Sequence, residues 1–390
     1  MTVRATKRGS ERTSLDGERA DVLICGASFA GLAVARELAM APDPPDVLVV
    51  DRYEIGERAT SACAAPTPWL HAMGVERSIR QELPEMTFTT PHGSVRYRLP
   101  WSWSAFDYRD LCRALWEQCG AARFETAKVE RRGADQDGAI TVETDRGTVG
   151  APLVVDALGW RRVLARHGYQ PPDAPLSRGL EVHPHVDDPG ATALDVWVER
   201  GLVRRGYGWR VPAGGEARVG VGSYEPRHHV REPTVALADR LDVDAVRYQG
   251  NWFPHRLREP AEDGVLFAGD SAGHCFPLSG EGIRTAFYFG IAAGRELRSA
   301  AAGEQTREQA LERYGAFHRR HAPAFRRALR LQRLVPALPP RVLTLALKAL
   351  APQPLVDRAF GWYLDQAHPD YAGPAARPAQ PTARPVVDAA

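Results

Sequence analysis

The sequence predicts an α/β protein with a parallel sheet, a second and antiparallel sheet, and a C-terminal helical region. Apolar runs at 21–25 and 46–50 flank a helical pattern over 30–40, which is the order of a β-α-β unit. Strand-like alternation with turn residues follows between about 176 and 223. Only helical patterns occur from 281 to about 365. These observations predict a parallel α/β domain joined to a second domain with an antiparallel sheet.

Length and composition exclude several classes of protein. The chain has 390 residues, of which 44% are hydrophobic, so it can bury one large core or two joined cores. A net charge of +2 without a dominant basic run argues against nucleic-acid binding. Five cysteines without a CxxC pair favour reduced thiols over disulfides or a zinc site. Without an apolar N-terminal stretch or a run of about 18 apolar residues, a cytoplasmic protein is expected.

A glycine-rich segment separates the first predicted strand from the helix that follows it. It reads Gly26-Ala-Ser-Phe-Ala-Gly31, with Ser28 in place of the middle glycine of the G-x-G-x-x-G pattern. Such a turn brings a dinucleotide pyrophosphate to a helix N-terminus. Asp51 ends the next strand and can accept hydrogen bonds from ribose hydroxyls, or it can be a surface residue. The predicted nucleotide contacts are Gly26, Ser28, Phe29, Ala30, Gly31, Asp51 and Arg52.

A second glycine-rich segment follows the predicted strand at 265–268. The strand ends in Gly269-Asp270, and a Pro-x-x-Gly-x-Gly run, Pro277 to Gly282, precedes a predicted helix. Both motifs resemble those of the flavoprotein hydroxylase superfamily. The resemblance implies a Rossmann-type FAD domain, p-hydroxybenzoate hydroxylase-like, with Asp270 on the ribitol and a positive helix end near the flavin. Further FAD contacts on this basis are Arg109, Gly159, Gly269, Asp270, Pro277, Gly280, Glu281, Gly282 and Ile283.

The predicted strand at 153–156 leads into a segment that departs from the superfamily. The superfamily has an Asp-Gly motif here that serves both FAD and nicotinamide handling, whereas this chain has Leu158-Gly159. No second glycine fingerprint indicates a nicotinamide domain. A conventional NADPH-gated hydroxylation is therefore disfavoured, and the reductant is expected to be either NADPH or a small electron carrier.

A motif in the predicted antiparallel sheet indicates the branch of the superfamily. Tyr207-Gly-Trp-Arg-Val-Pro212, followed by Gly220-Val-Gly222, resembles the Tyr-x-Trp-x-Phe-Pro and Gly-x-Gly signature of geranylgeranyl reductases. These enzymes use reduced FAD to saturate isolated double bonds in prenyl chains, which implies a small hydrophobic substrate. Cys63 falls where that family has a Cys-Gly-Gly turn beside the flavin. The candidate catalytic residues are Cys63, Tyr207 and Trp209, and each can instead be a core side chain.

Other flavoenzyme activities stay open as alternatives. An FAD-dependent monooxygenase or epoxidase acting on a natural product is the main one. The Tyr207 motif also resembles the Trp-x-Trp-x-Ile-Pro of flavin-dependent halogenases, which need an active-site lysine. The lysines are Lys7, Lys128 and Lys348, and none lies between the first fingerprint and residue 127. A non-redox FAD cyclase and a binding protein that keeps FAD as a structural part are further alternatives, and no metal site is predicted.

The C-terminal helices have two interpretations. Residues 325–350 alternate arginine with apolar residues, which predicts either a basic amphipathic surface near anionic lipid or a helical layer over the FAD domain. The first interpretation implies peripheral contact at the inner face of the membrane. The predicted divisions are an FAD domain (19–80, 101–165, 262–300), a substrate domain (81–100, 166–261), a helical region (301–370) and loose tails (1–18, 371–390).

Overall fold

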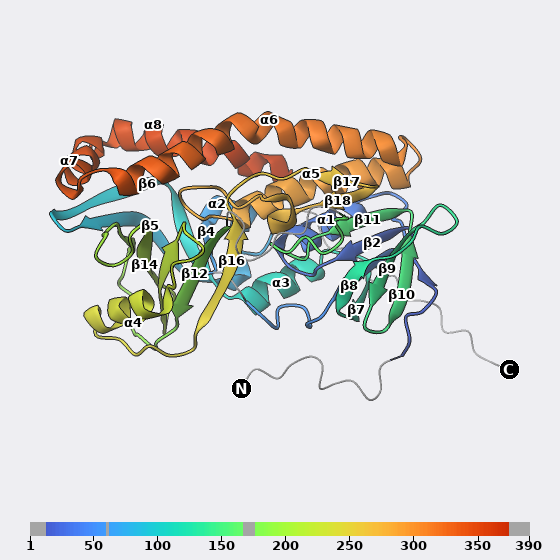
Figure 1. Ribbon diagram of the computed structural model, residues 1–390, viewed down its shortest axis with the longest axis horizontal. Coiled ribbons are helices and arrows are strands. Elements are labelled where there is room, and N and C mark those ends of the chain that lie inside the picture. Colours follow the sequence, from blue (N-terminus) through green and yellow to red (C-terminus); the bar gives the residue numbers. More distant parts are fainter. Residues whose placement is uncertain (1–12, 60–61, 167–175, 374–390) are drawn as a thin grey trace.

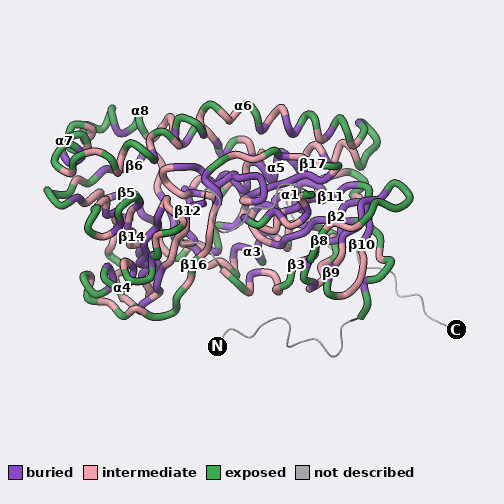
Figure 2. Tube along the Cα trace, in the orientation of Figure 1, coloured by how far each residue is buried: buried purple, intermediate pink, exposed green. Residues whose placement is uncertain are grey.

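The computed structural model describes residues 13–59, 62–166 and 176–373. Two sheet-containing parts lie side by side, and the long C-terminal helices run along one side of both (Figure 1). Buried residues concentrate in the strands and in helices α1 and α5, whereas the outer side of the C-terminal helices is exposed (Figure 2). The arrangement confirms the predicted α/β class with a second sheet that is antiparallel except at the β13–β5 pair, and with a C-terminal helical region.

A six-stranded, largely parallel sheet forms the centre of the first part. Its four central strands are apolar and buried, because helices and a smaller sheet cover them. Only its edge strand β17 pairs in the antiparallel sense. The order is β17 (Ala261–Glu262), β18 (Val265–Phe267), β11 (Leu153–Asp156), β2 (Val22–Cys25), β3 (Val47–Asp51) and β7 (Arg123–Thr126). The five parallel strands therefore end at one edge, where ligands bind in open α/β sheets.

Two helices pack closely against each other on this sheet. They are α1 (Phe29–Ala39) and α5 (Ile283–Ala301). A Cβ atom on Gly290 would lie 2.7 Å from the backbone oxygen of Ala30, so only glycine permits this approach. The N-terminal ends of both helices are thereby fixed near the carboxyl ends of the strands. Helix α3 (Tyr108–Trp116) contacts α1 as well.

The second part is an eight-stranded sheet. A long antiparallel pair, β5 (Ile79–Thr90) and β6 (Gly93–Phe106), joins the strands predicted from alternation, and α4 (Arg231–Arg240) packs against β12 and β15. The short helix α2 (Thr67–Ala72) packs against β6. The order of all the strands in this sheet is β16 (Gln249–Pro254), β12 (Leu176–Val182), β15 (Ala217–Ser223), β14 (Gly206–Pro212), β13 (Ala193–Trp197), β5, β6 and β4 (Ala64–Pro66).

A small four-stranded sheet includes the end of the segment that was predicted to be a loose N-terminal tail. Its strands are β1 (Glu18–Arg19), β10 (Gly147–Ala151), β9 (Ile140–Thr144) and β8 (Val129–Arg132). Leu15 is buried and its N–H donates to the Arg146 carbonyl oxygen at 2.7 Å, so residues 13–18 pack onto the domain because they add hydrogen bonds and apolar contact. Residues 1–12 of the predicted tail, and 374–390 of the C-terminal one, lie outside the described residues.

Three α-helices follow α5 among the residues up to 373. Helix α6 (Arg307–Leu334) packs on α5, and its buried Tyr314 donates to the Phe267 carbonyl oxygen at 2.9 Å, so α6 forms the predicted layer over the first part. Helices α7 (Pro340–Leu350) and α8 (Gln353–Leu364) reach the β5–β6 pair of the second part. No helix in the described ranges has the length and hydrophobicity that a membrane crossing requires.

Candidate flavin and substrate site

Three segments predicted from the sequence meet at the carboxyl edge of the parallel sheet. Gly26 has a φ of 113°, and a Cβ atom there would lie 2.3 Å from the carbonyl oxygen of Ala157. A Cβ atom on Gly269 would lie 3.0 Å from that of Ala30. The turn after β2, the turn after β11 and the turn after β18 therefore touch one another.

The turn before α1 is organised by Asp51. Its carboxylate accepts hydrogen bonds from the N–H groups of Ala27 (2.9 Å) and Tyr53 (3.0 Å). Burial raises the pKa of Asp51. A Cβ atom on Gly31 would lie 1.9 Å from the Gly26 carbonyl oxygen, which explains the second glycine of the motif. Ser28 accepts a hydrogen bond from the Tyr108 hydroxyl at 3.1 Å and does not cap α1.

Asp156 is a site residue that the sequence interpretation missed. Its buried carboxylate accepts from the N–H of Leu158 (2.9 Å), the N–H of Leu164 (2.8 Å) and the hydroxyl of Ser271 (2.6 Å). The same hydroxyl lies 3.0 Å from the Gly159 carbonyl oxygen. Asp156 thus ties the segment that carries Leu158 to the Gly-Asp turn. Its position at the end of a buried strand was the available signal.

Asp270 presents a carboxylate without a hydrogen-bond partner among the described residues. Burial raises its pKa to about 6, and the positive charge of Arg258 partly opposes that shift. A Cβ atom on Gly282 would lie 3.7 Å from Asp270 Oδ1, so the carboxylate lies close to the start of α5. Asp270 is partly exposed at this edge, and an acceptor that the described residues leave unpaired fits a ligand that supplies hydroxyl donors.

His274 has a structural role behind this turn. Its Nδ1 accepts a hydrogen bond from the Gly269 N–H at 3.1 Å, so its proton is on Nε2, which lies 3.1 Å from His318 Nδ1. The ring stacks on Phe289 with centroids 3.9 Å apart. Burial lowers the pKa of His274 well below its ordinary value, and the imidazole is neutral at pH 7.

The loop Pro277–Gly282 is held from the second sheet. The hydroxyl of Tyr207 donates to the Ser279 carbonyl oxygen, and the hydroxyl of Tyr224 donates to that of Leu278. Leu278 has a φ of 74°, an unusual conformation for a residue with a side chain, which these bonds help to maintain. The loop position therefore depends on the strand that carries the reductase-like motif.

The C-terminal helices hold the same loop from the other side. Gln332 of α6 accepts from the Leu278 N–H at 2.8 Å. Tyr363 of α8 donates to Glu281 Oε2 at 2.7 Å, and Glu281 also forms a buried ion pair with Arg284 at 2.9 Å. The Glu281 carboxylate, predicted to contact the cofactor, is thus engaged within the protein. Pro277 and Ile283 are buried beside it.

Cys63 lies in a buried turn before β4. Its φ is 50°, and its carbonyl oxygen accepts from the Phe106 N–H (2.9 Å) and the guanidinium of Arg218 (2.7 Å). The Phe106 ring lies 6.1 Å from that of Phe29, the first residue of α1. Burial raises the pKa of the Cys63 thiol to about 12, although the charge of Arg218 lowers it. Arg218 was not predicted, and no local motif identifies it.

Trp209 lies across the glycines of the second motif. A Cβ atom on Gly220 would lie 2.4 Å from Trp209 Cζ2, which explains why glycine follows the Tyr-x-Trp motif. Its indole N–H donates to Glu181 at 3.0 Å, and its ring lies 5.8 Å from that of Tyr207. A Cβ atom on Gly280 would lie 3.1 Å from the Tyr207 hydroxyl. Tyr207 therefore lies between Trp209 and the loop before α5.

Two predicted contacts have exposed side chains. The guanidinium of Arg52 stacks on the Tyr53 ring at 4.7 Å. Arg109 contributes its backbone, since a Cβ atom on Gly56 would lie 2.7 Å from the Arg109 Cα atom. Neither guanidinium donates a hydrogen bond to the three converging turns within the part of the chain that is described.

The arrangement fits FAD. Ser28 does not cap α1, so the positive end of this helix is available for phosphate. The first turn of α5 is the second helix end at the site, and there the Glu281 carboxylate accepts from the Arg284 N–H at 3.1 Å. The unpaired Asp270 carboxylate lies near the second of these ends. Among residues 13–59, 62–166 and 176–373, no group of three or more His, Cys, Asp or Glu side chains could hold a metal ion.

Sequence comparisons identify reductases as relatives. No protein-family model matches the chain. A geranylgeranyl diphosphate reductase from Rhodobacter capsulatus is 31% identical over 115 residues, which cover 28% of this chain and only 28% of that enzyme. A menaquinone reductase from Mycobacterium tuberculosis is 27% identical over 318 residues, which cover 71% of this chain and 75% of that enzyme.

Solved structures show how widely the fold is shared. A geranylgeranyl bacteriochlorophyll reductase-like protein from Thermoplasma acidophilum superposes with a TM-score of 0.74 at 16% identity, covering 91% of this chain and 98% of that one. A probable FAD-dependent monooxygenase from Pseudomonas aeruginosa gives 0.63 at 18% identity, with 88% and 100% covered. A flavin-dependent brominase gives 0.60 at 15% identity, with 90% and 100% covered.

The three kinds of observation agree. The motifs converge on one site, the sequence relatives are reductases, and the fold is that of FAD-dependent flavoproteins. By sequence and by fold, the chain is similar to FAD-dependent oxidoreductases of the geranylgeranyl reductase type.

Proposed function

We propose that the protein transfers hydride from reduced FAD to a carbon–carbon double bond of a prenyl or isoprenoid substrate. The hydrogen bond from Tyr207 to Ser279 carries the proposal, because it joins the reductase-like strand to the loop before α5. The relatives named for geranylgeranyl compounds and for menaquinone support the substrate class, since both kinds of molecule contain a polyprenyl chain.

In this proposal the protein binds and orients the cofactor. Asp51 takes the adenosine ribose, the start of α1 takes the pyrophosphate, and Asp270 takes the ribitol hydroxyls. The start of α5 stabilises negative charge on the reduced ring. When bound, reduced FAD supplies the hydride, so the alkene gains two electrons at one carbon and needs a proton at the other. The electron donor that reduces FAD is either NADPH or a small carrier.

An apolar surface supports a prenyl substrate. Partly buried aromatic residues pack against the core cluster between the second sheet and α8. An apolar chain that lies on this surface would exclude water from the alkene, which favours proton and hydride transfer over side reactions. The aromatic residues are Phe88, Tyr207, Trp209, Phe360 and Tyr363.

The reaction also needs a proton at the second alkene carbon. Burial raises the pKa values of Cys63 and Tyr207, so both groups are protonated at neutral pH. The Tyr207 proton is already committed to the Ser279 carbonyl oxygen. A pKa of about 12 makes the Cys63 thiol a weak acid, so we propose that Cys63 is not the main proton donor.

The test separates the two classes of acceptor. The purified protein is reduced without oxygen and then mixed with a polyprenyl substrate, or with oxygen and an aromatic compound. Reoxidation by the prenyl chain supports the reductase.

An FAD-dependent monooxygenase is the second candidate, and the fold shared with the Pseudomonas aeruginosa protein favours it. Leu158, which stands where hydroxylases have Asp, weighs against it. Reoxidation that occurs only with oxygen and an aromatic compound would support this candidate instead.

A further inference from the structure

Helix α7 presents an apolar stripe to solvent. Val342, Leu345, Ala346 and Ala349 follow the i, i+3, i+4, i+7 spacing of one helix face, and all four are exposed. Leu345 is 67% exposed and Val342 is 47% exposed. We call these four residues the α7 stripe. A helix of a soluble protein normally turns such a face to the core, so this face needs a partner.

Basic residues flank the α7 stripe and continue along α6, which leads away from α7 (Figure 1). Arg341 and Lys348 flank it on the same helix, and both are exposed. Between Glu312 and Asp357 the sequence has nine basic residues and no acidic one. All nine are exposed: Arg313, Arg319, Arg320, Arg326, Arg327, Arg330, Arg333, Arg341 and Lys348. An apolar stripe beside a basic region complements a surface that combines hydrocarbon with negative charge.

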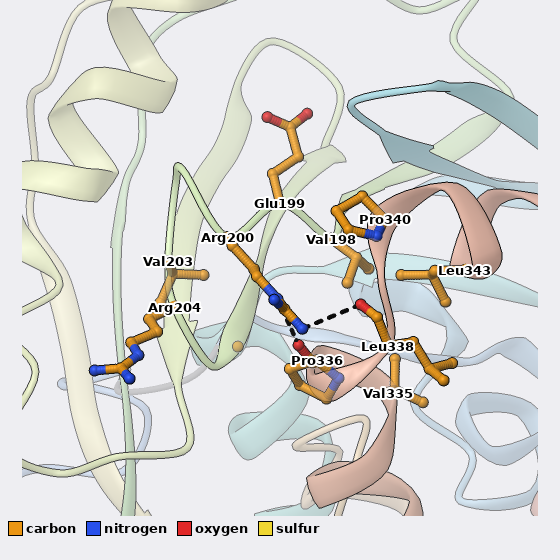
Figure 3. A pocket seen from close by; sticks show the side chains of 11 residues that line it. Val198, Glu199, Arg200, Val203, Arg204, Val335, Pro336, Leu338, Pro340 and Leu343 are labelled. Carbon is orange, nitrogen blue, oxygen red and sulfur yellow. Dashed lines mark hydrogen bonds between the residues drawn. The ribbon is translucent and has the colours of Figure 1, made fainter.

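The inner side of α7 is fixed to the protein. Buried Leu343 and Thr344 face inward, and the Thr344 hydroxyl lies 2.7 Å from that of Thr90 in the β5–β6 hairpin. Arg200, in the turn after β13, donates to the carbonyl oxygens of Pro336 (2.9 Å) and Leu338 (3.2 Å), which fixes the α6–α7 corner (Figure 3). The stripe is therefore preformed and does not have to fold on contact.

We propose that the α7 stripe, with Arg341 and Lys348 beside it, docks the protein on an anionic lipid bilayer. The exposed apolar side chains enter the boundary between headgroups and acyl chains, and the basic side chains contact lipid phosphates. This surface goes beyond the proposed reaction, and it would give the enzyme access to substrates that dissolve in the bilayer.

Flotation with vesicles tests the surface without any turnover, so the result does not depend on the reaction. The full-length protein is mixed with phosphatidylglycerol–phosphatidylcholine vesicles or with phosphatidylcholine vesicles. We expect binding to the anionic vesicles that weakens at high salt. Leu345→Glu should lower the partition coefficient at least tenfold, and Lys348→Gln should lower it about fivefold.

Matched variants separate this surface from general stickiness. Val246 is 42% exposed and precedes β16 on the second sheet, so Val246→Glu should bind vesicles like the wild type. Arg131 is an exposed cation on β8, and Arg131→Gln should also leave binding unchanged. Wild-type circular dichroism and melting temperature for Leu345→Glu show that the variant is folded.

Absence of binding to anionic vesicles would overturn the proposal, as would equal loss with Leu345→Glu and Val246→Glu. Light scattering provides a further check on the occupant of the stripe. A dimer that Leu345→Glu converts to a monomer would show that a second copy covers the stripe, and the lipid proposal would then be wrong.

Discussion

The hydroxyl of Tyr207 donates a hydrogen bond to the backbone carbonyl oxygen of Ser279. Tyr207 belongs to β14 of the eight-stranded sheet, and Ser279 belongs to the loop before α5 of the first part. One side chain thus connects the predicted substrate surface with the predicted flavin position. Gly280 permits the approach, since any Cβ atom there would crowd the hydroxyl at 3.1 Å.

Removal of this hydroxyl should weaken FAD binding. Tyr207→Phe keeps the ring and loses one buried hydrogen bond, which is worth about 1 kcal/mol, or about fivefold in the FAD dissociation constant. Fluorescence titration of the apoprotein measures the constant. Tyr97→Phe is the matched control, because Tyr97 donates a similar bond (2.7 Å) to the Leu347 carbonyl oxygen, at α7. Equal FAD affinity in Tyr207→Phe and wild type would contradict the prediction.

Asp270→Asn should weaken flavin retention by roughly 1–3 kcal/mol, because a partly buried carboxylate acceptor is lost. The apoprotein should not lose stability, since Asp270 has no hydrogen-bond partner among the described residues. Asp156→Asn should behave oppositely and unfold more easily, because Asp156 accepts three hydrogen bonds. Denaturant unfolding and flavin content measure both effects. Full flavin content in Asp270→Asn would mean that the Gly-Asp motif is misassigned.

The apoprotein should also show a pH dependence that Asp270 causes. Its pKa of about 6 in the folded state exceeds the reference value of 3.8, so the ionised carboxylate destabilises the fold. Relative to Asp270→Asn, the wild type should gain unfolding free energy as the pH falls from about 6 to about 4. Parallel pH profiles for the two apoproteins would rule out this role of burial.

Gly220→Ala should disturb the position of Trp209. The added Cβ atom would lie 2.4 Å from Trp209 Cζ2 and 2.6 Å from the Leu180 carbonyl oxygen, which predicts a loss of about 1–3 kcal/mol in unfolding free energy. Gly215→Ala is the control, because a Cβ atom there meets no atom within 4 Å. Chemical denaturation of the two variants should give clearly different midpoints, and equal midpoints would refute the packing argument.

Cys63→Ala should keep FAD bound and reducible. With a thiol pKa of about 12, we expect substrate-dependent reoxidation to stay within about threefold of the wild-type rate. Stopped-flow absorbance measures this step. A loss above about tenfold in both Cys63→Ala and Cys63→Ser, with normal flavin content, would instead show that the thiol donates the proton.

Local patterns were enough to predict the elements around the cofactor. The strand at 153–156 and the helix near 281–299 correspond to β11 and to α5 (Ile283–Ala301), because apolar runs and glycine-rich turns are local signals. The alternating strands between 193 and 223 were also predicted. The β5–β6 pair was not, although residues 81–100 were assigned to the second domain.

Contacts between distant segments could not be predicted in this way. Arg218 donates a hydrogen bond to the carbonyl oxygen of Cys63, which is 155 residues away in sequence. Tyr363 donates one to the carboxylate of Glu281, which is 82 residues away. Neither pair has a spacing or motif that marks it, because only the packing of the sheets and C-terminal helices brings them together.

The most direct test of the account is the product of one anaerobic turnover, analysed by mass spectrometry. Protein that carries reduced FAD is mixed with an equimolar amount of a polyprenyl substrate, and the molecular mass of the extracted product is measured. We expect the prenyl product to gain two hydrogen atoms per flavin oxidised and no oxygen. An unchanged prenyl chain without oxygen, together with an aromatic product that gains one oxygen atom in air, would contradict it.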